Sequence, residues 1–336
     1  MDTNQTRDIT QQQVTNLSAD FQRVREAIGQ QILGQQKLVD RLLMALLSHG
    51  HLLVEGAPGL AKTTAIKVLA EYIEGNFHRI QFTPDLLPAD LTGTEVYRPQ
   101  SGDFEFQKGP LFHNLILADE VNRAPAKVQS ALLEAMGEQQ ITIGKTTYPL
   151  PGLFLVMATQ NPIEQEGTYP LPEAQLDRFL MHVTIDYPEA STELDILHLA
   201  QRRDLAEFNH EESDVQMLSE EKIFEAQKAL LNLYMAENLE QYLIELILAT
   251  RNPGKYSESL ANHINFGGSP RATIALDRCA RAHAFLQGRD HVLPEDIHAV
   301  AHDVLRHRII LSFEAEAEGI TVDHVIDQLL QSVPLP

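Results

Sequence analysis

The sequence predicts an α/β protein built on a parallel sheet and followed by a helical domain. A glycine-bearing loop, residues 56–64, stands between an apolar run and a helix-prone segment, as in phosphate-binding folds. Further apolar runs alternate with helical patterns up to about residue 190, which is typical of a parallel sheet covered on both faces. After that point the patterns are helical, with little strand signal. We therefore expect an α/β core over residues 19–190 and an α-helical domain over residues 191–336.

Composition narrows the possible partners and compartments. The chain has a formal net charge of −21 and shows no basic stripe, which argues against nucleic acid as its main partner. No apolar run approaches the roughly 20 residues needed to cross a bilayer, and no signal peptide is evident. Cys279 is the single cysteine, so no internal disulfide can form. We expect a cytoplasmic protein without a membrane segment.

The segment before the loop contains a polar tail and two helices. Residues 1–18 are rich in Gln and Asn and are expected to form the tail. A helix is predicted from Ala19 by four apolar residues at helical spacing: Phe21, Val24, Ile28 and Ile32. A second helix is predicted over Gln36–His49.

Five apolar runs predict the strands of the sheet: His51–Glu55, His78–Phe82, Leu115–Ala118, Leu153–Thr159 and Met181–Ile185. Alternating segments around turns predict two β-hairpins, at about residues 91–110 and 139–150. Phe104 and Phe106 in the first hairpin have two interpretations. They pack on their own subunit, or they line a pore or contact a protein client.

The loop itself predicts a nucleotide site. Its backbone amides and the N-terminus of the following helix can bind an anion. Lys62 can bind the β- and γ-phosphates, and the Thr63 hydroxyl can bind Mg²⁺. Ala61 stands where a glycine usually precedes the lysine, and its methyl group fits if the residue has helical dihedral angles. The predicted cofactor-binding residues of the loop are Gly56, Ala57, Pro58, Gly59, Leu60, Ala61, Lys62, Thr63 and Thr64.

Polar residues at the ends of two later strands predict hydrolysis. Asp119 can hold Mg²⁺, directly or through water, and Glu120 can polarise the attacking water. Asn161 follows the next apolar strand, where an amide can orient that water or serve only as a turn residue before Pro162.

Two arginines are further candidates. Arg178 either pairs with Asp177 at the surface or serves as an arginine finger for a neighbouring subunit's ATP. Arg271 begins a helix, where the helix dipole disfavours a cation. This conflict favours a functional role for Arg271, in which it contacts phosphate from the second domain.

Taken in order, the segments GAPGLAKT, LILADEVNRAP, MATQNP, LPEAQLDRF and GGSPRA resemble the MoxR-type AAA+ ATPases over roughly residues 30–320. The resemblance implies a P-loop AAA+ core with a five-stranded parallel sheet and an all-α lid. It implies Walker A at residues 56–64, Walker B at Asp119 and Glu120, and sensor one at Asn161. Arg178 matches the trans-acting finger and Arg271 matches sensor two. The residues that match the adenine-lining stretch are Ile32, Gly34 and Gln35.

The same resemblance implies a function. MoxR-type proteins are Mg²⁺-dependent ATPases that assemble into rings, usually hexamers, and act as chaperone-like factors that remodel or activate protein clients. A partner with a von Willebrand factor A domain is often involved. The alternatives are the ATPase subunit of a magnesium chelatase-like complex, a nucleic-acid motor, or a nucleotide-gated scaffold without useful turnover.

Overall fold

The computed structural model describes residues 3–100, 102–162, 167–206 and 217–335. Ser101 of the predicted hairpin turn, residues 207–216 and 336 of the predicted helical domain, and residues 1–2 lie outside this range. The helices are α1 Thr3–Gln31, α2 Gln36–Leu47, α3 Lys62–Glu71, α4 Pro88–Thr92, α5 Ala126–Glu138, α6 Glu173–Leu176, α7 Ala190–Ala206, α8 Glu220–Leu231, α9 Glu237–Arg251, α10 Glu258–His263, α11 Pro270–Leu286, α12 Pro294–Leu305, α13 Phe313–Ala317 and α14 Val322–Ser332. The strands are β1 Leu52–Glu55, β2 Phe77–Gln81, β3 Gly93–Arg98, β4 Asp103–Lys108, β5 Leu115–Asp119, β6 Gln140–Ile143, β7 Thr146–Pro149, β8 Leu155–Gln160, β9 Met181–Thr184, β10 Ile264–Phe266 and β11 Ile310–Leu311.

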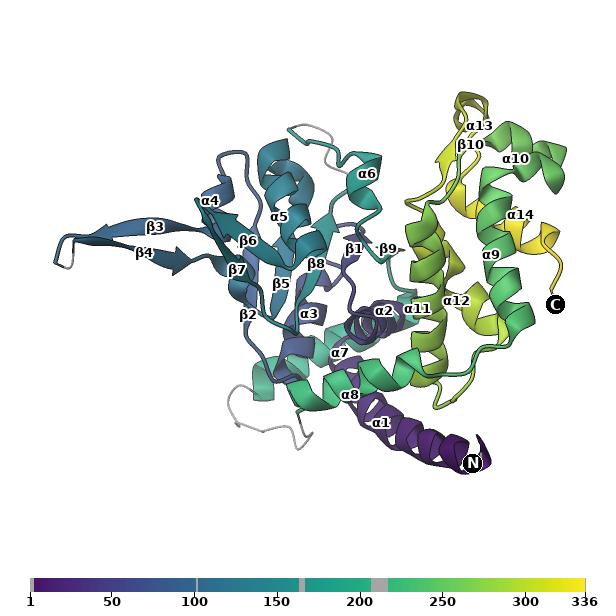
Figure 1. The fold of residues 1–336 in the computed structure, drawn as a ribbon, viewed down its shortest axis with the longest axis horizontal. Coiled ribbons are helices and arrows are strands. Elements are labelled where there is room, and N and C mark those ends of the chain that lie inside the picture. Colours follow the sequence, from purple (N-terminus) through teal and green to yellow (C-terminus); the bar gives the residue numbers. More distant parts are fainter. Residues whose placement is uncertain (1–2, 101, 163–166, 207–216, 336) are drawn as a thin grey trace.

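The five predicted strands form one parallel sheet, flanked by helices, in the order β2-β5-β8-β1-β9 (Figure 1). The central strand β8 pairs with β5 on one side and with β1 on the other. Because all strands run the same way, the residues that follow β1, β5 and β8 meet at one edge of the sheet. The phosphate loop, the acidic pair and Asn161 follow these three strands.

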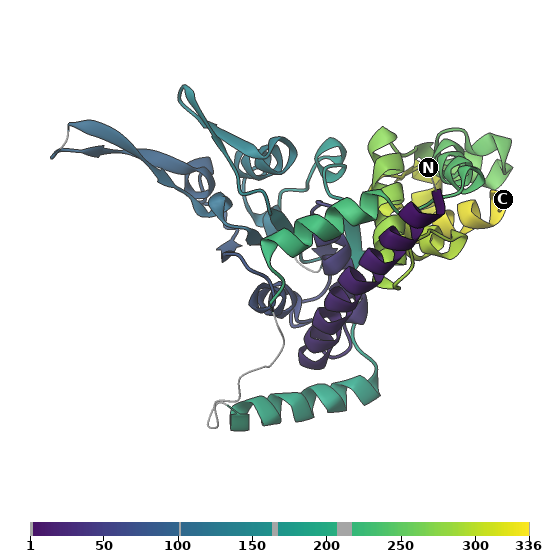
Figure 2. The ribbon, with the colours of Figure 1, turned by 60° about the horizontal axis from the view of Figure 1, so that its bottom comes forward.

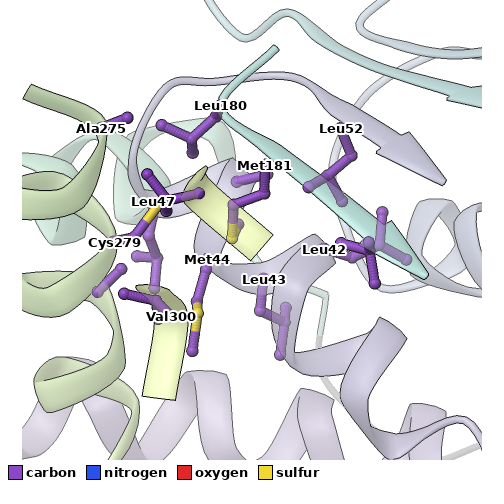
Figure 3. Close-up of a cluster of buried hydrophobic side chains, with 14 of the residues drawn as sticks. Leu42, Leu43, Met44, Leu47, Leu52, Leu180, Met181, Ala275, Cys279 and Val300 are labelled. Atoms are coloured by element: carbon purple, nitrogen blue, oxygen red, sulfur yellow. The ribbon is translucent and has the colours of Figure 1, made fainter. Parts of the chain in front are cut away.

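Helix α2 lies between the sheet and the helical domain and joins the two. In Figure 3 the side chains of Met44 and Leu47 from α2 lie among residues of β9, α11 and α12. These belong to one continuous buried cluster that includes Leu52, Met181, Cys279 and Val300. Each fully buried aliphatic side chain stabilises the fold by about 1.5–3 kcal/mol. The two regions therefore share one apolar core.

The first helix is longer than the sequence pattern predicts. It begins at Thr3 rather than Ala19, so residues 3–18 are helical and the prediction of a polar tail there is wrong. Val14 is buried, and the Ser18 hydroxyl donates a hydrogen bond to the Phe285 carbonyl at 2.7 Å. Figures 1 and 2 show α1 running beside α8 towards the helical domain. Tertiary contacts with α11, which a local pattern cannot reveal, stabilise the added turns.

Both predicted hairpins are present, as β3–β4 and β6–β7. The first projects from the body on the side away from the C-terminal helices (Figure 1). Phe106 stacks on Tyr148 of the second hairpin, with ring centroids 4.2 Å apart, so it packs within its own subunit. Phe104 is 68% exposed and lies beside Tyr97. The client-contact interpretation therefore remains open only for Phe104.

Among the described residues of the C-terminal region, the secondary structure is helical apart from one small antiparallel pair, β10–β11. Its helices α11 and α12 lie against each other and against the core described above. Among the described residues, no helix is long and apolar enough to cross a membrane.

Candidate active site

The phosphate loop leaves β1 and enters α3, as predicted. A Cβ on Gly56 would lie 2.4 Å from Cγ1 of Ile185, so this close approach requires glycine. The Lys62 ammonium donates hydrogen bonds to the carbonyl oxygens of Gly56, at 2.5 Å, and Gln160, at 3.4 Å. Lys62 is thereby held between the carboxyl ends of β1 and β8.

Ala61 departs from the predicted geometry. Its φ of 56° and ψ of 19° are left-handed, not the right-handed helical values on which its fit depended. An L-residue pays roughly 1–2 kcal/mol in this region, whereas glycine adopts it freely. Its carbonyl nevertheless accepts the hydrogen bond from the Ala65 amide that starts α3. The loop therefore keeps its helix start at the cost of strain at Ala61.

The predicted acidic pair and Asn161 come together with the loop. Asp119, Glu120, Thr159 and Asn161 line one cavity of about 360 Å³. The remaining lining residues are those of the loop, Pro58 through Thr64. The cavity thus contains an ammonium, a hydroxyl, an amide and two carboxylates, the groups that phosphoryl transfer to water requires.

Two residues that sequence reasoning missed hold the Asp119 carboxylate. Thr159 donates from its hydroxyl to Oδ1 at 2.6 Å, and Arg79 donates from its guanidinium to Oδ2 at 2.6 Å. Thr159 lies on β8 and Arg79 on β2, the two neighbours of β5. Knowledge of the strand order would have indicated both, because each faces Asp119 from an adjacent strand.

Glu120 is also fixed by neighbours that the motif does not contain. Its backbone is left-handed, with φ 55° and ψ 51°, and its amide donates to the Thr159 hydroxyl oxygen at 2.9 Å. Gln81 donates from its side-chain amide to Oε2 at 3.0 Å, and Arg123 lies 3.3 Å from the same atom. A non-glycine residue in this conformation is strained, and such strain clusters at functional sites.

The charges around Lys62 act in opposite directions. Burial lowers the pKa of its ammonium, while the carboxylates of Asp119, Glu120 and Glu55 act to raise it. The pKa of Glu55, just before the loop, is itself lowered, chiefly by its hydrogen bond with His182 at 2.9 Å. The pKa of Lys62 is lowered overall, because burial outweighs the nearby carboxylates.

Of the three residues predicted to lie beside adenine, two line a cavity. Gly34 and Gln35 line a polar cavity of about 660 Å³ together with Ile185, the residue that closely approaches Gly56. Gln35 donates to the carbonyl of Asp186. Ile32 does not line this cavity, because its side chain is buried in the main apolar core.

Arg178 and Arg271 line one cavity, and neither lines the phosphate-loop cavity. Both line a cavity of about 310 Å³ that shares no lining residue with the phosphate-loop cavity. Arg178 donates to the carbonyl of Leu133. The alternative of a surface ion pair between Arg178 and Asp177 is wrong, because the Asp177 carboxylate accepts from Arg308 and Ser269 instead.

Known proteins match this chain over most of its length. A model of the ATPase family associated with various cellular activities (AAA) matches residues 51–181, and an AAA lid-domain model matches residues 259–329. Chaperone MoxR1 of Mycobacterium tuberculosis is 45% identical over 91% of this chain and 79% of its own length. A crystal structure of a Cytophaga hutchinsonii protein matches with a TM-score of 0.88, 48% identity and 97% coverage of both chains.

The chain belongs to the MoxR family of AAA+ ATPases. It is an ATP hydrolase, as predicted, and the predicted fold class is confirmed by the sheet, the lid and the two family models. The chelatase alternative is not favoured. Magnesium-chelatase subunit ChlI-2 of Arabidopsis thaliana is only 26% identical, over 58% of this chain and 43% of its own length.

Within this MoxR-family chain the candidate site residues form two groups. Lys62, Thr63, Asp119, Glu120 and Asn161 share the phosphate-loop cavity. Arg178 and Arg271 share the second cavity, which is lined by two further arginines and which we call the arginine cavity. One chain therefore presents a cavity lined by the candidate phosphate-binding residues and a separate cavity lined by Arg178, Arg271 and two further arginines.

Proposed function

We propose that this MoxR-family ATPase hydrolyses ATP with Mg²⁺ in a ring whose active sites are each completed by an adjacent copy. The observation that carries the proposal is the division of the candidate residues between two cavities. The phosphate-loop cavity has the groups that hold phosphate and activate water, while Arg178 and Arg271 line a different cavity. Arginines in that position suit a neighbour's phosphates better than those of their own chain.

The roles within the phosphate-loop cavity follow from its chemistry. Thr63 and Asp119 would hold Mg²⁺, which supplies charge neutralisation at the β- and γ-phosphates. Both Asp119 oxygens already accept short hydrogen bonds, which favours a contact through water. Lys62 binds the phosphates, Glu120 accepts a proton from the attacking water, and Asn161 orients that water.

The base and ribose of ATP suit the neighbouring polar cavity. Gly34 and Gln35 border it, and Ile185 connects it to Gly56 at the start of the loop. Ile32 acts only indirectly, by packing this segment against the core.

The arginines would stabilise charge in the adjacent site. A finger supplied by a partner is worth about 10³–10⁵ in turnover in related phosphoryl-transfer enzymes. Because each copy then needs its neighbour's arginines, a closed ring fits, and we propose a hexamer. The similarity to Chaperone MoxR1 supports a chaperone role. We further propose that this role is the remodelling of protein clients, with a von Willebrand factor A domain protein as the adaptor. The buried free thiol of Cys279 fits the cytoplasm.

The test is Glu120→Gln in assembled protein. We expect phosphate release to fall by about 10²–10⁴-fold, with ATP affinity retained, because only the acceptor of the water proton is removed. Native mass spectrometry in ATP would report the ring size, and affinity capture on the trapped variant would identify client and adaptor. Unchanged turnover would contradict the catalytic assignment. Turnover stimulated by DNA and weakened by salt would favour the nucleic-acid motor instead.

A further inference from the structure

The arginine cavity is built from two parts of the chain that are far apart in sequence. Arg178 follows α6 in the α/β core, and Arg271 lies in the first turn of α11 in the lid. Both line the same cavity, together with Arg278 and Arg308. For two arginines to act on one phosphate group, the core and the lid must be fixed relative to each other at this point.

Asp177 makes that connection. Its Oδ2 accepts a hydrogen bond from the Ser269 hydroxyl at 2.7 Å. Ser269 is the N-cap of α11, and its oxygen accepts from the Arg271 amide at 3.1 Å. A continuous chain of bonds therefore runs from Arg178, through the adjacent Asp177, to Ser269 and Arg271.

The other carboxylate oxygen of Asp177 is held by Arg308. Its Nε donates to Oδ1 at 2.7 Å, and the same guanidinium donates to the carbonyls of Phe179, at 2.6 Å, and Leu180, at 3.1 Å. The Arg308 side chain is 2% exposed and that of Asp177 is 19% exposed, so this pair is largely shielded from solvent. Arg308 therefore balances the charge of Asp177, and the cavity keeps the positive charges of Arg178, Arg271 and Arg278.

We propose that Asp177 is a positioning residue that sets Arg178 and Arg271 as one unit for the phosphates of an adjacent copy. This rests on the proposed function, in which both arginines act in trans. Asp177 touches no substrate itself. It acts through the helix cap that begins α11 and through its peptide bond to Arg178, so its loss should impair the neighbour's site and not its own.

Mixed rings test the direction of this effect. Lys62→Ala subunits keep their arginines but lack a working phosphate loop, and Arg178→Ala subunits have the reverse defect. Mixing the two should restore activity where an intact loop meets an intact arginine pair. Asp177→Asn added to the Lys62→Ala subunit should reduce the restored activity by about 10- to 100-fold, the cost of misplacing a catalytic group by roughly 1 Å. Added to the Arg178→Ala subunit, Asp177→Asn should change the restored activity by less than about twofold, because the arginine pair of that subunit is already incomplete.

A second variant avoids leaving Arg308 without its charged partner. Ser269→Ala, placed on the Lys62→Ala subunit, breaks the chain of bonds and should also reduce the restored activity, while Ser269→Thr keeps the hydroxyl and should preserve it. Ser312→Ala is the matched control, because Ser312 also caps a lid helix. Its hydroxyl donates to the Asn262 carbonyl at 2.6 Å and accepts from the Ala315 amide at 3.2 Å, and the residue lies outside the arginine cavity. It should leave the restored activity unchanged.

The outcomes separate this inference from the proposed function. If the mixture of Lys62→Ala and Arg178→Ala subunits restores no activity, the arginines do not act in trans, and the proposed positioning role of Asp177 is also overturned. If the mixture works but Asp177→Asn has equal effects on the two subunits, only the positioning role is overturned. A loss with Ser312→Ala as large as with Ser269→Ala would equally show a general stability effect and overturn it.

Discussion

The phosphate-loop cavity and the arginine cavity differ in what holds them together. The first is built by residues that follow adjacent parallel strands, so the sheet alone brings Lys62, Asp119 and Glu120 into one place. The second cavity lies between a turn of the core and the start of a lid helix. The Asp177 carboxylate in that turn accepts hydrogen bonds from Ser269 and Arg308 of the lid. The first should therefore tolerate changes in lid position, and the second should not. The predictions below test that difference, beginning with the largest effect.

Removing the finger should give the largest loss. We expect Arg178→Ala to lower the turnover of assembled protein by about 10³-fold or more, because the transferred phosphoryl group loses the arginine supplied by the adjacent copy. The Kd for ATP should be unchanged, since Arg178 does not line the phosphate-loop cavity of its own chain. Steady-state phosphate release and equilibrium binding of a fluorescent ATP analogue give the two quantities. Arg23→Ala, at an exposed position, is the control. A weaker Kd with normal turnover would place Arg178 in its own nucleotide site.

The second prediction asks whether Arg271 acts on its own chain or on a neighbour. Arg271→Ala should lower turnover by about 10²-fold, the usual cost of one charge-stabilising donor. If both arginines act in trans, every site in a mixture of Arg178→Ala and Arg271→Ala subunits lacks one of them, so mixing restores nothing. Recovery of activity in that mixture, measured by phosphate release, would show that Arg271 serves its own chain.

Thr159 tests how the sheet positions the acidic pair. Its buried hydroxyl bonds to the Asp119 carboxylate and the Glu120 amide, and Thr159→Val removes both bonds at nearly constant volume. We expect turnover to fall by about 10- to 100-fold, as for other groups that orient catalytic ligands. The Kd for ATP should stay within about twofold, because the loop is untouched. Thr159→Ser keeps the hydroxyl and should restore turnover. Failure of that rescue would show that Thr159 acts through packing.

Much of this site could be predicted because its residues occur in contiguous motifs at strand ends. Lys62, Asp119 and Asn161 each follow an apolar run, and the parallel sheet then brings them to one edge. Thr159 and Gln81 were missed, because their partners lie on neighbouring strands and periodicity does not reveal the order β2-β5-β8. The contacts that these residues make are therefore known only from the assembled sheet.

Two other differences between the sequence-based expectation and the structure also arise from long-range contacts. The segment before Ala19 has little apolar character, yet Ser18 and Val14 pack it against the body of the protein. The separation of Arg271 from the phosphate loop depends on where the lid docks, which is set by buried bonds such as those of Arg308. Local pattern predicted the helix that carries Arg271, but it could not predict which cavity that helix faces.

The smallest effect concerns the strain at Ala61. Ala61→Gly should raise the free energy of unfolding by about 0.5–1 kcal/mol, because relief of the left-handed strain exceeds the entropy that glycine adds to the unfolded chain. Gly144→Ala is the matched opposite change, since Gly144 has a φ of +60° with open space around its Cβ position. It should lower the free energy by about the same amount. Urea denaturation without nucleotide measures both. A loss of stability with Ala61→Gly would show that the methyl group, which is partly buried against the core, contributes more than its conformation costs.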